Sequence, residues 1–342
     1  MKAQILRRIA PVEEKPLELV ELPIPEPGDR QILVKVLACG VCHTELDEIE
    51  GRLRPKLPII LGHEIVGRVE KLGPRVTKFK PGDRVGIAWI NSACGSCRFC
   101  REGNENLCPE FKATGCDVDG GYAEYTVVTE DFAYPIPDRF TDTEAAPLLC
   151  AGVIGYRALR LTGLRDGQVL GLYGFGASAH IVIQIVKHKY PNTRVFVFTR
   201  PGQKHHQELA KRLGADWVGA TGDTPPEKLD CAIDTTPVWT PVVEALRVLQ
   251  KGGRLVINAI RKEEHDKEVL LRLDYATHIW QEKEVKSVAN VTRSDAEEFL
   301  PLAAEIPIRP EVQEFKLEEA NQALVLLKQG KIKGAGVLRI SE

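Results

Sequence analysis

The clearest chemical signal in the sequence is a group of four cysteines in one short segment. Cys94, Cys97, Cys100 and Cys108 follow the spacing C-x2-C-x2-C-x7-C, and Pro109 follows the last of them. Four thiolates at about 2.3 Å satisfy the tetrahedral preference of zinc and leave no position for water. The spacing therefore predicts a structural zinc site. Iron–sulfur ligation and unmetallated cysteines are the alternatives, although the iron–sulfur run C-x2-C-x2-C-x3-C-P has a shorter last gap.

A second possible metal site is spread along the chain. Cys42 follows an apolar run, His63 comes about twenty residues later, and Cys150 lies much further on. None of them is convincing alone, because an isolated cysteine is usually a small core residue. Together, two sulfurs and one imidazole form a ligand set that leaves zinc an open fourth position. Such a site can bind an alcohol oxygen and lower its pKa.

A glycine-rich turn predicts a nucleotide site. Residues 169–173 are a continuous apolar run typical of a buried strand, and residues 178–188 have a helical pattern. The turn between them fits G-x-G-x-x-G/A, in which glycines let the backbone approach a pyrophosphate at a helix N-terminus. The expected dinucleotide contacts are Gly174, Gly176, Ala177, Ser178 and Ala179.

The end of the next expected strand, residues 195–198, indicates which dinucleotide is bound. NAD sites usually carry an acid there that binds the ribose 2′-hydroxyl. This strand ends in Phe198, and Thr199 and Arg200 follow. Arg200 could pair with a 2′-phosphate, Thr199 could donate a hydrogen bond, and Lys204 lies near. The sequence therefore favours NADP(H) over NAD(H), unless Arg200 stacks on the adenine without discriminating.

The elements that must position these residues change in character near residue 145. Before it, short β-type runs separated by Gly- and Pro-rich turns predict a mostly antiparallel β domain; the runs are 32–37, 65–69, 84–89 and 123–128. After it, helical stretches alternate with expected strands at 169–173, 195–198, 230–234, 255–259 and 285–288. This alternation predicts a parallel sheet with helices on both faces. Helices at 294–304 and 317–329 and a strand at 335–340 follow, so the fold class is α/β.

Composition excludes several classes of function. The chain has 342 residues and 43% hydrophobic content, which is enough for two domains. Its net charge is -2 without long runs of one sign, so neither nucleic acid nor a membrane surface is an expected partner. The N-terminal residues lack the apolar stretch of a signal peptide. We therefore expect a cytoplasmic protein, in which cysteines are more often metal ligands than disulfides.

An ordered series of motifs gives the chain a specific family resemblance. It contains GVCHTEL, LGHEIVG, PGDRVG, the four-cysteine segment, DGGYAEY, LLCAGVIGYRAL and YGFGASAH in that order. In these motifs it resembles the zinc-dependent alcohol dehydrogenases of the medium-chain dehydrogenase/reductase family, from about residue 20 to the C-terminus. The resemblance implies a GroES-like catalytic domain over residues 1–150 and 292–342 with a structural zinc lobe at 91–110. It also implies a Rossmann dinucleotide-binding domain over residues 151–291.

The resemblance implies roles for the residues around the second metal site. The catalytic zinc is expected on Cys42, His63 and Cys150, and Glu64 takes a turn as ligand in some relatives. Thr44 would receive the alcohol proton, and His43 would face the cofactor pyrophosphate. Many relatives have Asp at the position of Glu45, where the carboxylate fixes the tautomer of the zinc-bound histidine.

The end of the proton relay is less clear, because some relatives have a histidine at the position of Asp47. Asp47 could accept the proton, the proton could leave through His43 or water, or Asp47 could be a solvated surface residue. Trp89 and Ile90 resemble a substrate-pocket segment of microbial relatives that favours small alcohols, although a core tryptophan is an equal reading of Trp89.

The remaining cofactor contacts also come from the resemblance. Ala259 and Ile260, and Ala289 and Val291, would flank the nicotinamide with backbone groups. Some relatives have a pyrophosphate-binding Arg at the position of Ala335, a role that Arg293 or Lys333 would have to supply here.

The implied reaction is reversible oxidation of a small primary or secondary alcohol, with two zinc ions per chain and a homodimer or homotetramer as the assembly. The alternatives are a polyol or aromatic-alcohol dehydrogenase that uses NAD(H), and a catalytically silent zinc-bearing nucleotide-binding protein. A zinc-free quinone reductase is disfavoured, because such relatives lack both cysteine sets.

Overall fold

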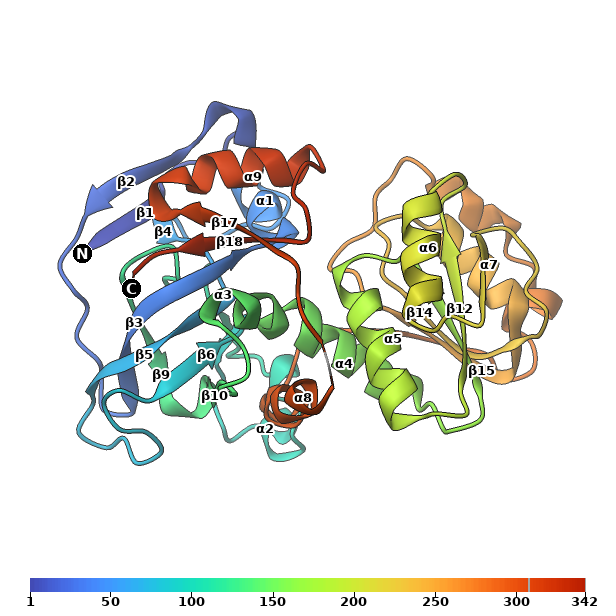
Figure 1. The fold of residues 1–342 in the computed structure, drawn as a ribbon, viewed down its shortest axis with the longest axis horizontal. Helices are drawn as coiled ribbons and strands as arrows, with labels where there is room; N and C mark the ends of the chain where they lie inside the picture. Colours follow the sequence, from blue (N-terminus) through green and yellow to red (C-terminus); the bar gives the residue numbers. More distant parts are fainter. Residues whose placement is uncertain (307, 342) are drawn as a thin grey trace. The chain divides into compact units, whose positions relative to one another are not determined.

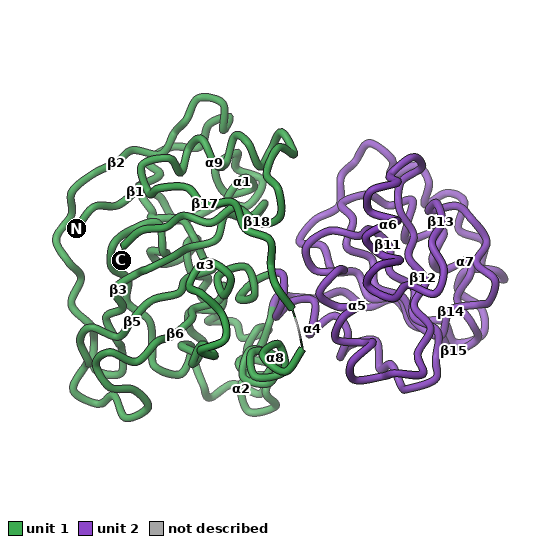
Figure 2. The backbone as a smooth tube through the Cα atoms, in the orientation of Figure 1, with its two compact units in different colours: residues 1–150, 291–342 green, residues 151–290 purple. Residues whose placement is uncertain are grey.

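This computed structural model describes residues 1–306 and 308–341 and divides into two units (Figure 2). Unit 1 comprises Met1–Cys150 and Val291–Glu342, and unit 2 comprises Ala151–Asn290. The boundaries expected from the sequence lie after residues 150 and 291. Figure 1 shows the elements of each unit.

A mostly antiparallel sheet of seven strands forms the centre of unit 1. Its order is β10-β6-β5-β3-β18-β17, β9 also pairs with β3, and the β17–β18 pair is parallel. The strands are β3 (Gln31–Val41), β5 (Ile65–Leu72), β6 (Arg84–Ile87), β9 (Tyr125–Thr129), β10 (Ala133–Pro135), β17 (Val312–Lys316) and β18 (Ala335–Arg339). Val- and Ile-rich runs suit a buried pleated surface, and β3 is buried along most of its length. β3 therefore holds the residues that follow it, beginning with Cys42, at a fixed place.

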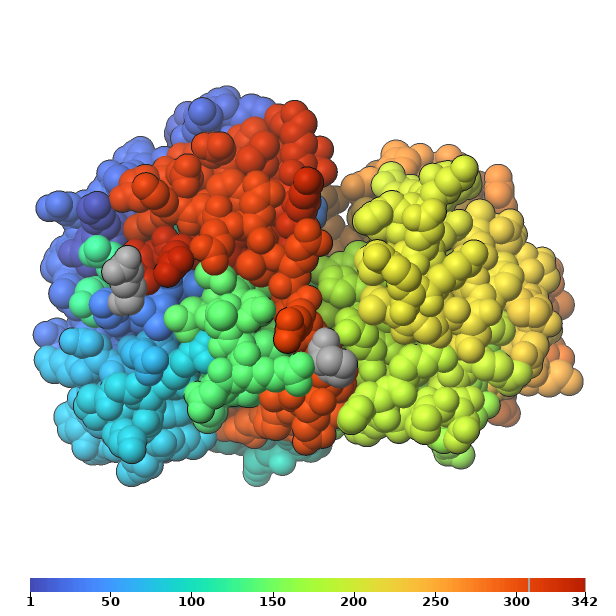
Figure 3. Space-filling view, viewed as in Figure 1, coloured from blue at the N-terminus to red at the C-terminus, as the bar shows by residue number. Residues whose placement is uncertain are grey.

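Smaller elements surround this sheet. Two further sheets, of order β2-β1-β4 and β7-β8, consist of β1 (Lys2–Leu6), β2 (Leu17–Glu21), β4 (Ile59–Ile60), β7 (Ile90–Ser92) and β8 (Lys112–Ala113). The α-helices are α1 (His43–Ile49), α2 (Arg98–Arg101), α3 (Asp142–Ala145), α8 (Arg293–Glu305) and α9 (Ala320–Lys328). α9 lies at the surface beside the N-terminal segment (Figure 3), where Lys328 pairs with Glu13 at 2.8 Å.

Unit 2 contains a parallel sheet of six strands in the order β13-β12-β11-β14-β15-β16. The strands are β11 (Val169–Tyr173), β12 (Arg194–Thr199), β13 (Trp217–Ala220), β14 (Leu229–Asp234), β15 (Leu249–Ile257) and β16 (Glu284–Ser287). The helices are α4 (Ala151–Thr162), α5 (Ala177–Lys189), α6 (Lys204–Arg212) and α7 (Thr240–Val248). β11 is buried at every position, as its unbroken apolar sequence predicts.

The strand order of unit 2 reverses between β11 and β14. From β11 the chain proceeds one way through α5 and α6, and later the other way from β14 through α7. Because such crossovers are right-handed, the two sets of helices cover opposite faces of the sheet. Ligands of doubly wound sheets bind outside the carboxyl ends of the strands at this switch point. The Gly-rich turn after β11 lies there.

The structure confirms the α/β fold class, with a Rossmann-type parallel sheet and an antiparallel β domain. Several expected elements differ in their bounds; the strand expected at 32–37, for example, is the longer β3, Gln31–Val41. The strand expected at 255–259 begins at Leu249, because a parallel pair of Leu229 with Leu249 extends it toward its start. The helix expected at 317–329 begins with a separate 3-10 turn at Leu317–Glu319.

Candidate active site and cofactor site

Three segments of unit 1 bring the expected catalytic ligands together. Cys42 ends the connection from β3 and is the N-cap of α1, His63 and Glu64 lie between β4 and β5, and Cys150 ends the 3-10 turn at Ala146–Leu149. Their ligand atoms all lie within 4.8 Å of one another. His63 and Glu64 are buried, with 1% and 5% exposure, so any ion that they bind would be shielded from bulk water.

The geometry of this cluster fits zinc. Two thiolates bound to one tetrahedral zinc at about 2.3 Å lie about 3.8 Å apart. The Sγ atoms of Cys42 and Cys150 are separated by 3.9 Å, and both cysteines are free. Two sulfurs, one imidazole nitrogen and one carboxylate oxygen are also a donor set that zinc accepts.

Glu45 supports the ligand set from α1. Its Oε1 lies 2.6 Å from His63 Nδ1, and its Oε2 accepts a hydrogen bond of 2.8 Å from the Cys42 backbone N–H. With Nδ1 facing a carboxylate, His63 presents its other ring nitrogen to the sulfurs. This contact is the one that the Asp of relatives implied, made here by a side chain one methylene longer.

The ligand groups of the buried cluster change one another's pKa values through hydrogen bonds and charge. A hydrogen bond with Cys150 lowers the pKa of Cys42 well below its usual value, against the effect of burial. Burial alone would lower the pKa of His63, yet Glu45 and Cys42 raise it well above its usual value. Burial and the charge of Cys42 raise the pKa of Glu64. Burial and mutual repulsion thus disfavour the anionic forms of Glu64 and Cys150, and a bound dication would stabilise those forms.

Gly40 makes room for Glu64. A Cβ atom at position 40 would lie 1.8 Å from Glu64 Oε2 and 2.8 Å from its Cβ. The Gly40 backbone N–H also donates to the Glu64 carbonyl at 2.9 Å. Only glycine therefore allows the Glu64 carboxylate to reach the sulfurs from beside β3.

The predicted proton-handling residues all lie on α1. Thr44 Oγ1 is 3.7 Å from Cys42 Sγ, and His43 is exposed. Asp47 has 6% exposure and pairs with Arg52, so it is not the solvated surface residue of the alternative reading. Sequence analysis missed Glu48, which is fully buried and whose pKa is raised well above its usual value by burial and by Glu45. Its i,i+3 spacing from Glu45 was the available signal.

The four-cysteine segment forms a second cluster of donors in unit 1. Cys94 and Cys100 have Sγ atoms 3.9 Å apart, and Cys97 and Cys100 have theirs 3.6 Å apart, again close to the zinc value. Backbone N–H groups of Ser96 and Cys97 lower the pKa of Cys94 to about 6. Cys108 accepts hydrogen bonds from the backbone of Cys94 and Glu110 at 3.4 and 3.3 Å. Such N–H···S bonds favour thiolates, the form that binds metal.

The Gly-rich turn of unit 2 has two glycines with different roles. Gly174 has φ of 81°, and a Cβ there would meet Thr235 Oγ1 at 2.8 Å, so the fold itself requires glycine. Gly176 has φ of -94°, and nothing lies within 4 Å of its would-be Cβ. Its missing side chain therefore leaves open space at the N-terminus of α5. Beside it Ala177 is exposed, Ala179 is buried, and Ser178 donates to the Ala151 carbonyl at 2.9 Å.

The residues at and after the end of β12, where a 2′-phosphate is expected to bind, differ in exposure and in hydrogen bonding. Phe198 is fully buried and stacks on Tyr173 at 4.2 Å. The Thr199 hydroxyl donates to the Arg200 carbonyl at 3.2 Å and accepts from Gln207 at 3.0 Å, so its use as a donor to phosphate requires the first of these bonds to break. Arg200 and Lys204 are both exposed.

Gln203 is a further residue at this position, which sequence analysis did not single out. Its amide satisfies both neighbours when the oxygen faces Arg200, 2.8 Å from Nη2 and 3.3 Å from Nε, and the nitrogen faces His206 Nδ1 at 3.1 Å. The Nη1 side of the Arg200 guanidinium then retains its N–H donors for a phosphate.

The other predicted contacts lie in varied surroundings. Ile260 is 56% exposed and Ala289 is exposed, whereas Val291 is buried. Arg293 is held inside unit 1: its backbone N–H and its Nε both lie 2.9 Å from Glu105 Oε1, so a contact with pyrophosphate would need this pair to open. Trp89 is half-buried, and its ring centroid lies 5.6 Å from that of Phe111. Ile90 is fully buried in β7. Ala259 is half-buried beside Ile260.

Among the residues that the structure describes, no helix is both long and apolar enough to cross a membrane.

Comparison with known proteins identifies the family. Residues 28–138 match the alcohol dehydrogenase GroES-like domain. The chain is 43% identical over 346 residues to the probable alcohol dehydrogenase AdhA of Mycobacterium tuberculosis, which covers 99% of this chain and 97% of that protein.

Solved structures of alcohol dehydrogenases are also similar to this chain. An alcohol dehydrogenase from the hyperthermophilic archaeon Aeropyrum pernix matches with a TM-score of 0.84 at 28% identity, covering 99% of this chain and 100% of that one. A cinnamyl alcohol dehydrogenase from Sorghum bicolor matches with a TM-score of 0.83 at 27% identity, covering 99% and 97%.

The chain belongs to the zinc-type medium-chain alcohol dehydrogenase family. It is therefore an oxidoreductase, and the silent nucleotide-binding protein considered as an alternative is excluded.

Proposed function

We propose that this alcohol dehydrogenase is zinc-dependent and interconverts small primary or secondary alcohols with their carbonyl products, using NADP(H). The observation that supports this most strongly is the convergence of Cys42, His63, Glu64 and Cys150 within 4.8 Å. Cys94, Cys97, Cys100 and Cys108 would hold a structural zinc, which gives two zinc ions per chain.

Zinc held by Cys42, His63 and Cys150 would polarise the alcohol oxygen and lower its pKa, while a bound nicotinamide would accept the hydride. The side chains of α1 would then move the proton. Thr44 Oγ1, close to the Cys42 sulfur, would receive it, and the exposed His43 would pass it to solvent. Asp47 is a less direct exit, because Arg52 pairs with its carboxylate.

The preference for NADP(H) is supported by the end of β12. No carboxylate stands at Phe198 to repel a 2′-phosphate, and Arg200 and Lys204 offer two exposed positive charges there. Gln203 orients the guanidinium of Arg200 while leaving its Nη1 donors free. An Arg200→Ala variant should lose the preference for NADP+, whereas Arg212→Ala, an exposed arginine at the end of α6, should retain it.

An aromatic alcohol is the second candidate substrate. Trp89 and Phe111 form an aromatic pair with ring centroids 5.6 Å apart, and one similar protein is named a cinnamyl alcohol dehydrogenase. If Trp89 walls the substrate site, its ring could stack on an aromatic substrate.

We also propose a homodimer formed through β16 and a cytoplasmic location. β16 is an edge strand, and all four of its residues are exposed. Val285, Trp280 and Tyr275 on and before it are 50%, 54% and 64% exposed. An exposed edge with apolar side chains suits pairing with the same edge of a second copy. A Val285→Pro variant should then sediment as a monomer. The nine free cysteines fit a reducing compartment.

Metal analysis combined with a substrate panel tests the catalytic proposal. We expect two zinc ions per chain, and alcohol-dependent reduction of NADP+ faster than that of NAD+, across small aliphatic and aromatic alcohols. Full turnover without metal would overturn the zinc assignment. A strong preference for NAD+ would overturn the cofactor assignment and leave the zinc assignment intact.

A further inference from the structure

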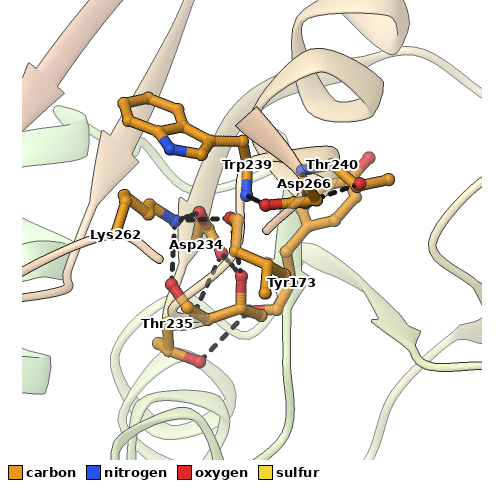
Figure 4. A network of polar contacts seen from close by, with 9 residues as sticks. Tyr173, Asp234, Thr235, Trp239, Thr240, Lys262 and Asp266 are labelled. Atoms are coloured by element: carbon orange, nitrogen blue, oxygen red, sulfur yellow. Dashed lines mark hydrogen bonds and ion pairs between the residues drawn. The ribbon is translucent and has the colours of Figure 1, made fainter. Parts of the chain in front are cut away.

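A buried lysine and aspartate lie at the carboxyl ends of the strands in unit 2 (Figure 4). Asp234 ends β14 and is fully buried, and the Lys262 side chain, which comes from the segment after β15, is 8% exposed. The ammonium of Lys262 donates to Asp234 Oδ2, and to the carbonyls of Thr236 and Val238 at 2.8 and 2.9 Å. All three N–H donors of the lysine are therefore satisfied.

The aspartate is equally well satisfied. Asp234 Oδ1 accepts from the Thr236 backbone N–H at 2.9 Å and from the Thr236 hydroxyl at 2.8 Å. A buried ion pair does not by itself stabilise a protein more than apolar side chains of similar size would. Its full set of hydrogen bonds instead fixes the position of the backbone segments that meet there.

The segment fixed in this way is residues 258–262. At its start, the Asn258 backbone N–H donates to the Asp234 carbonyl at 2.8 Å. At its end, Lys262 binds the Asp234 side chain. Both ends of this loop are thus attached to one residue, and Ile260 between them is 56% exposed.

Neighbouring contacts attach the continuation of the loop to the same turn. The Glu263 backbone N–H donates to the Pro237 carbonyl at 2.7 Å. Asp266 accepts from the backbone N–H groups of Trp239 and Thr240 at 3.0 and 2.8 Å, at the start of α7 (Figure 4). These hydrogen bonds therefore join the turn after β14 and the loop after β15 into one ordered surface.

The strand order indicates which part of a bound dinucleotide would contact this ordered surface. β12, which carries Arg200 at its end, lies on one side of the switch point, and β14 and β15 lie on the other. A dinucleotide whose adenosine half lies at β12 and whose pyrophosphate lies at the turn after β11 extends its nicotinamide half toward β14 and β15.

We propose that Lys262 is a positioning residue for the nicotinamide half of the cofactor, which it serves by attaching both ends of loop 258–262 to Asp234. The inference rests on the proposed function, because it takes a nicotinamide dinucleotide as the ligand of this sheet. A loop that is ordered before binding loses little conformational entropy when the nicotinamide arrives. Without the pair, the loop must be ordered on binding, and the affinity for the nicotinamide half falls.

The test compares a whole cofactor with the same molecule lacking nicotinamide. Dissociation constants of the holoenzyme are measured by calorimetry for NADP+ and for 2′-phospho-ADP-ribose, or for NAD+ and ADP-ribose if the wild type prefers NAD(H). Lys262→Met leaves a buried carboxylate unpaired and can fail to fold. The Lys262→Met/Asp234→Asn double variant removes both charges and keeps the measurement possible. Lys267→Met, which breaks only an exposed ion pair with Glu264, is the control.

We expect the double variant to bind the whole cofactor about tenfold more weakly than the wild type does. Its dissociation constant for the fragment should stay within about twofold of the wild-type value, because only the nicotinamide contacts depend on the order of loop 258–262. The control should change neither constant. Unchanged affinity for the whole cofactor, or equal weakening for cofactor and fragment, would overturn the inference. A wild type that binds no nicotinamide dinucleotide would instead overturn the proposed function.

Discussion

The two clusters of metal-binding side chains differ in how the chain assembles them. The four-cysteine cluster comes from one segment, Cys94 to Cys108, whose own backbone N–H groups bond to the sulfurs. The other cluster joins Cys42 and Cys150, which are 108 positions apart in the sequence. Yet each contains a pair of sulfurs 3.9 Å apart. The similar spacing shows that local and long-range assembly can produce equally good metal geometry.

What separates the clusters is the chemistry of their other donors. The first offers only thiolates, so a bound zinc would have no position for a substrate. The second offers an imidazole and the carboxylate of Glu64, and Thr44 lies beside it. We therefore expect changes at the second cluster to abolish turnover, and changes at the first to affect stability.

The largest effect is expected for Cys42→Ser. Loss of one thiolate should release the catalytic zinc and lower kcat by about a thousandfold. Without the metal, nothing polarises the alcohol oxygen or lowers its pKa before hydride transfer. Steady-state kinetics and metal analysis check this, with one zinc per chain remaining in the cysteine segment. If Cys42→Ser kept both its zinc content and its turnover, the cluster would not be the active site.

Glu45→Gln should have the next largest effect. The amide keeps the size of Glu45 but removes the charge that faces His63 Nδ1 at 2.6 Å. Removal of such a supporting group typically costs 10–100-fold in metal affinity or activity, and we expect a loss of about 30-fold here. Zinc affinity measured with a competing chelator reports it. Glu144→Gln, which changes an exposed capping carboxylate of α3, should leave zinc affinity unaltered.

The same contrast explains how much of the site the sequence could predict. The four-cysteine cluster is visible from spacing alone, because its geometry is made within one segment. Spacing alone does not identify Cys42, His63 and Cys150 as ligands, since each isolated residue is compatible with a core role. Their grouping was predicted only because an ordered set of motifs resembled a known family, and β3 and the neighbouring turns bring them together.

Contacts that depend on side-chain direction lay beyond sequence reasoning. The sequence suggests a pyrophosphate role for Arg293, and it could not show that the guanidinium pairs with the buried Glu105, nearly two hundred positions away along the chain. Lys262 reads as an ordinary surface lysine, and only the fold places Asp234 beneath it. The fold class was predictable because it follows from local alternation of strands and helices, whereas these pairs depend on tertiary packing.

A smaller effect is expected for Gly40→Ala, which tests the position of Glu64. The added methyl would meet the Glu64 carboxylate, and relief by local movement should cost about 1–3 kcal/mol of stability. We also expect turnover to fall about tenfold as the displaced carboxylate disturbs the ligand set. The Gly40→Ala/Glu64→Ala double variant should regain stability in urea denaturation but not turnover. Strictly additive stability losses would show that the two side chains do not compete for this space.

The smallest effect on turnover is expected for Cys97→Ser, the counterpart of Cys42→Ser in the other cluster. Its zinc would have no open position, so kcat per folded molecule should stay within about threefold of the wild type. Stability should suffer instead, because the binding energy of a structural zinc contributes to folding, and we expect the thermal midpoint to fall by about 5–10 °C. Calorimetry, metal analysis and kinetics on one preparation separate these outcomes. A loss of kcat as large as that of Cys42→Ser, with zinc still bound at Cys42, His63 and Cys150, would show that the four-cysteine cluster takes part in turnover and that the contrast between the two clusters does not hold.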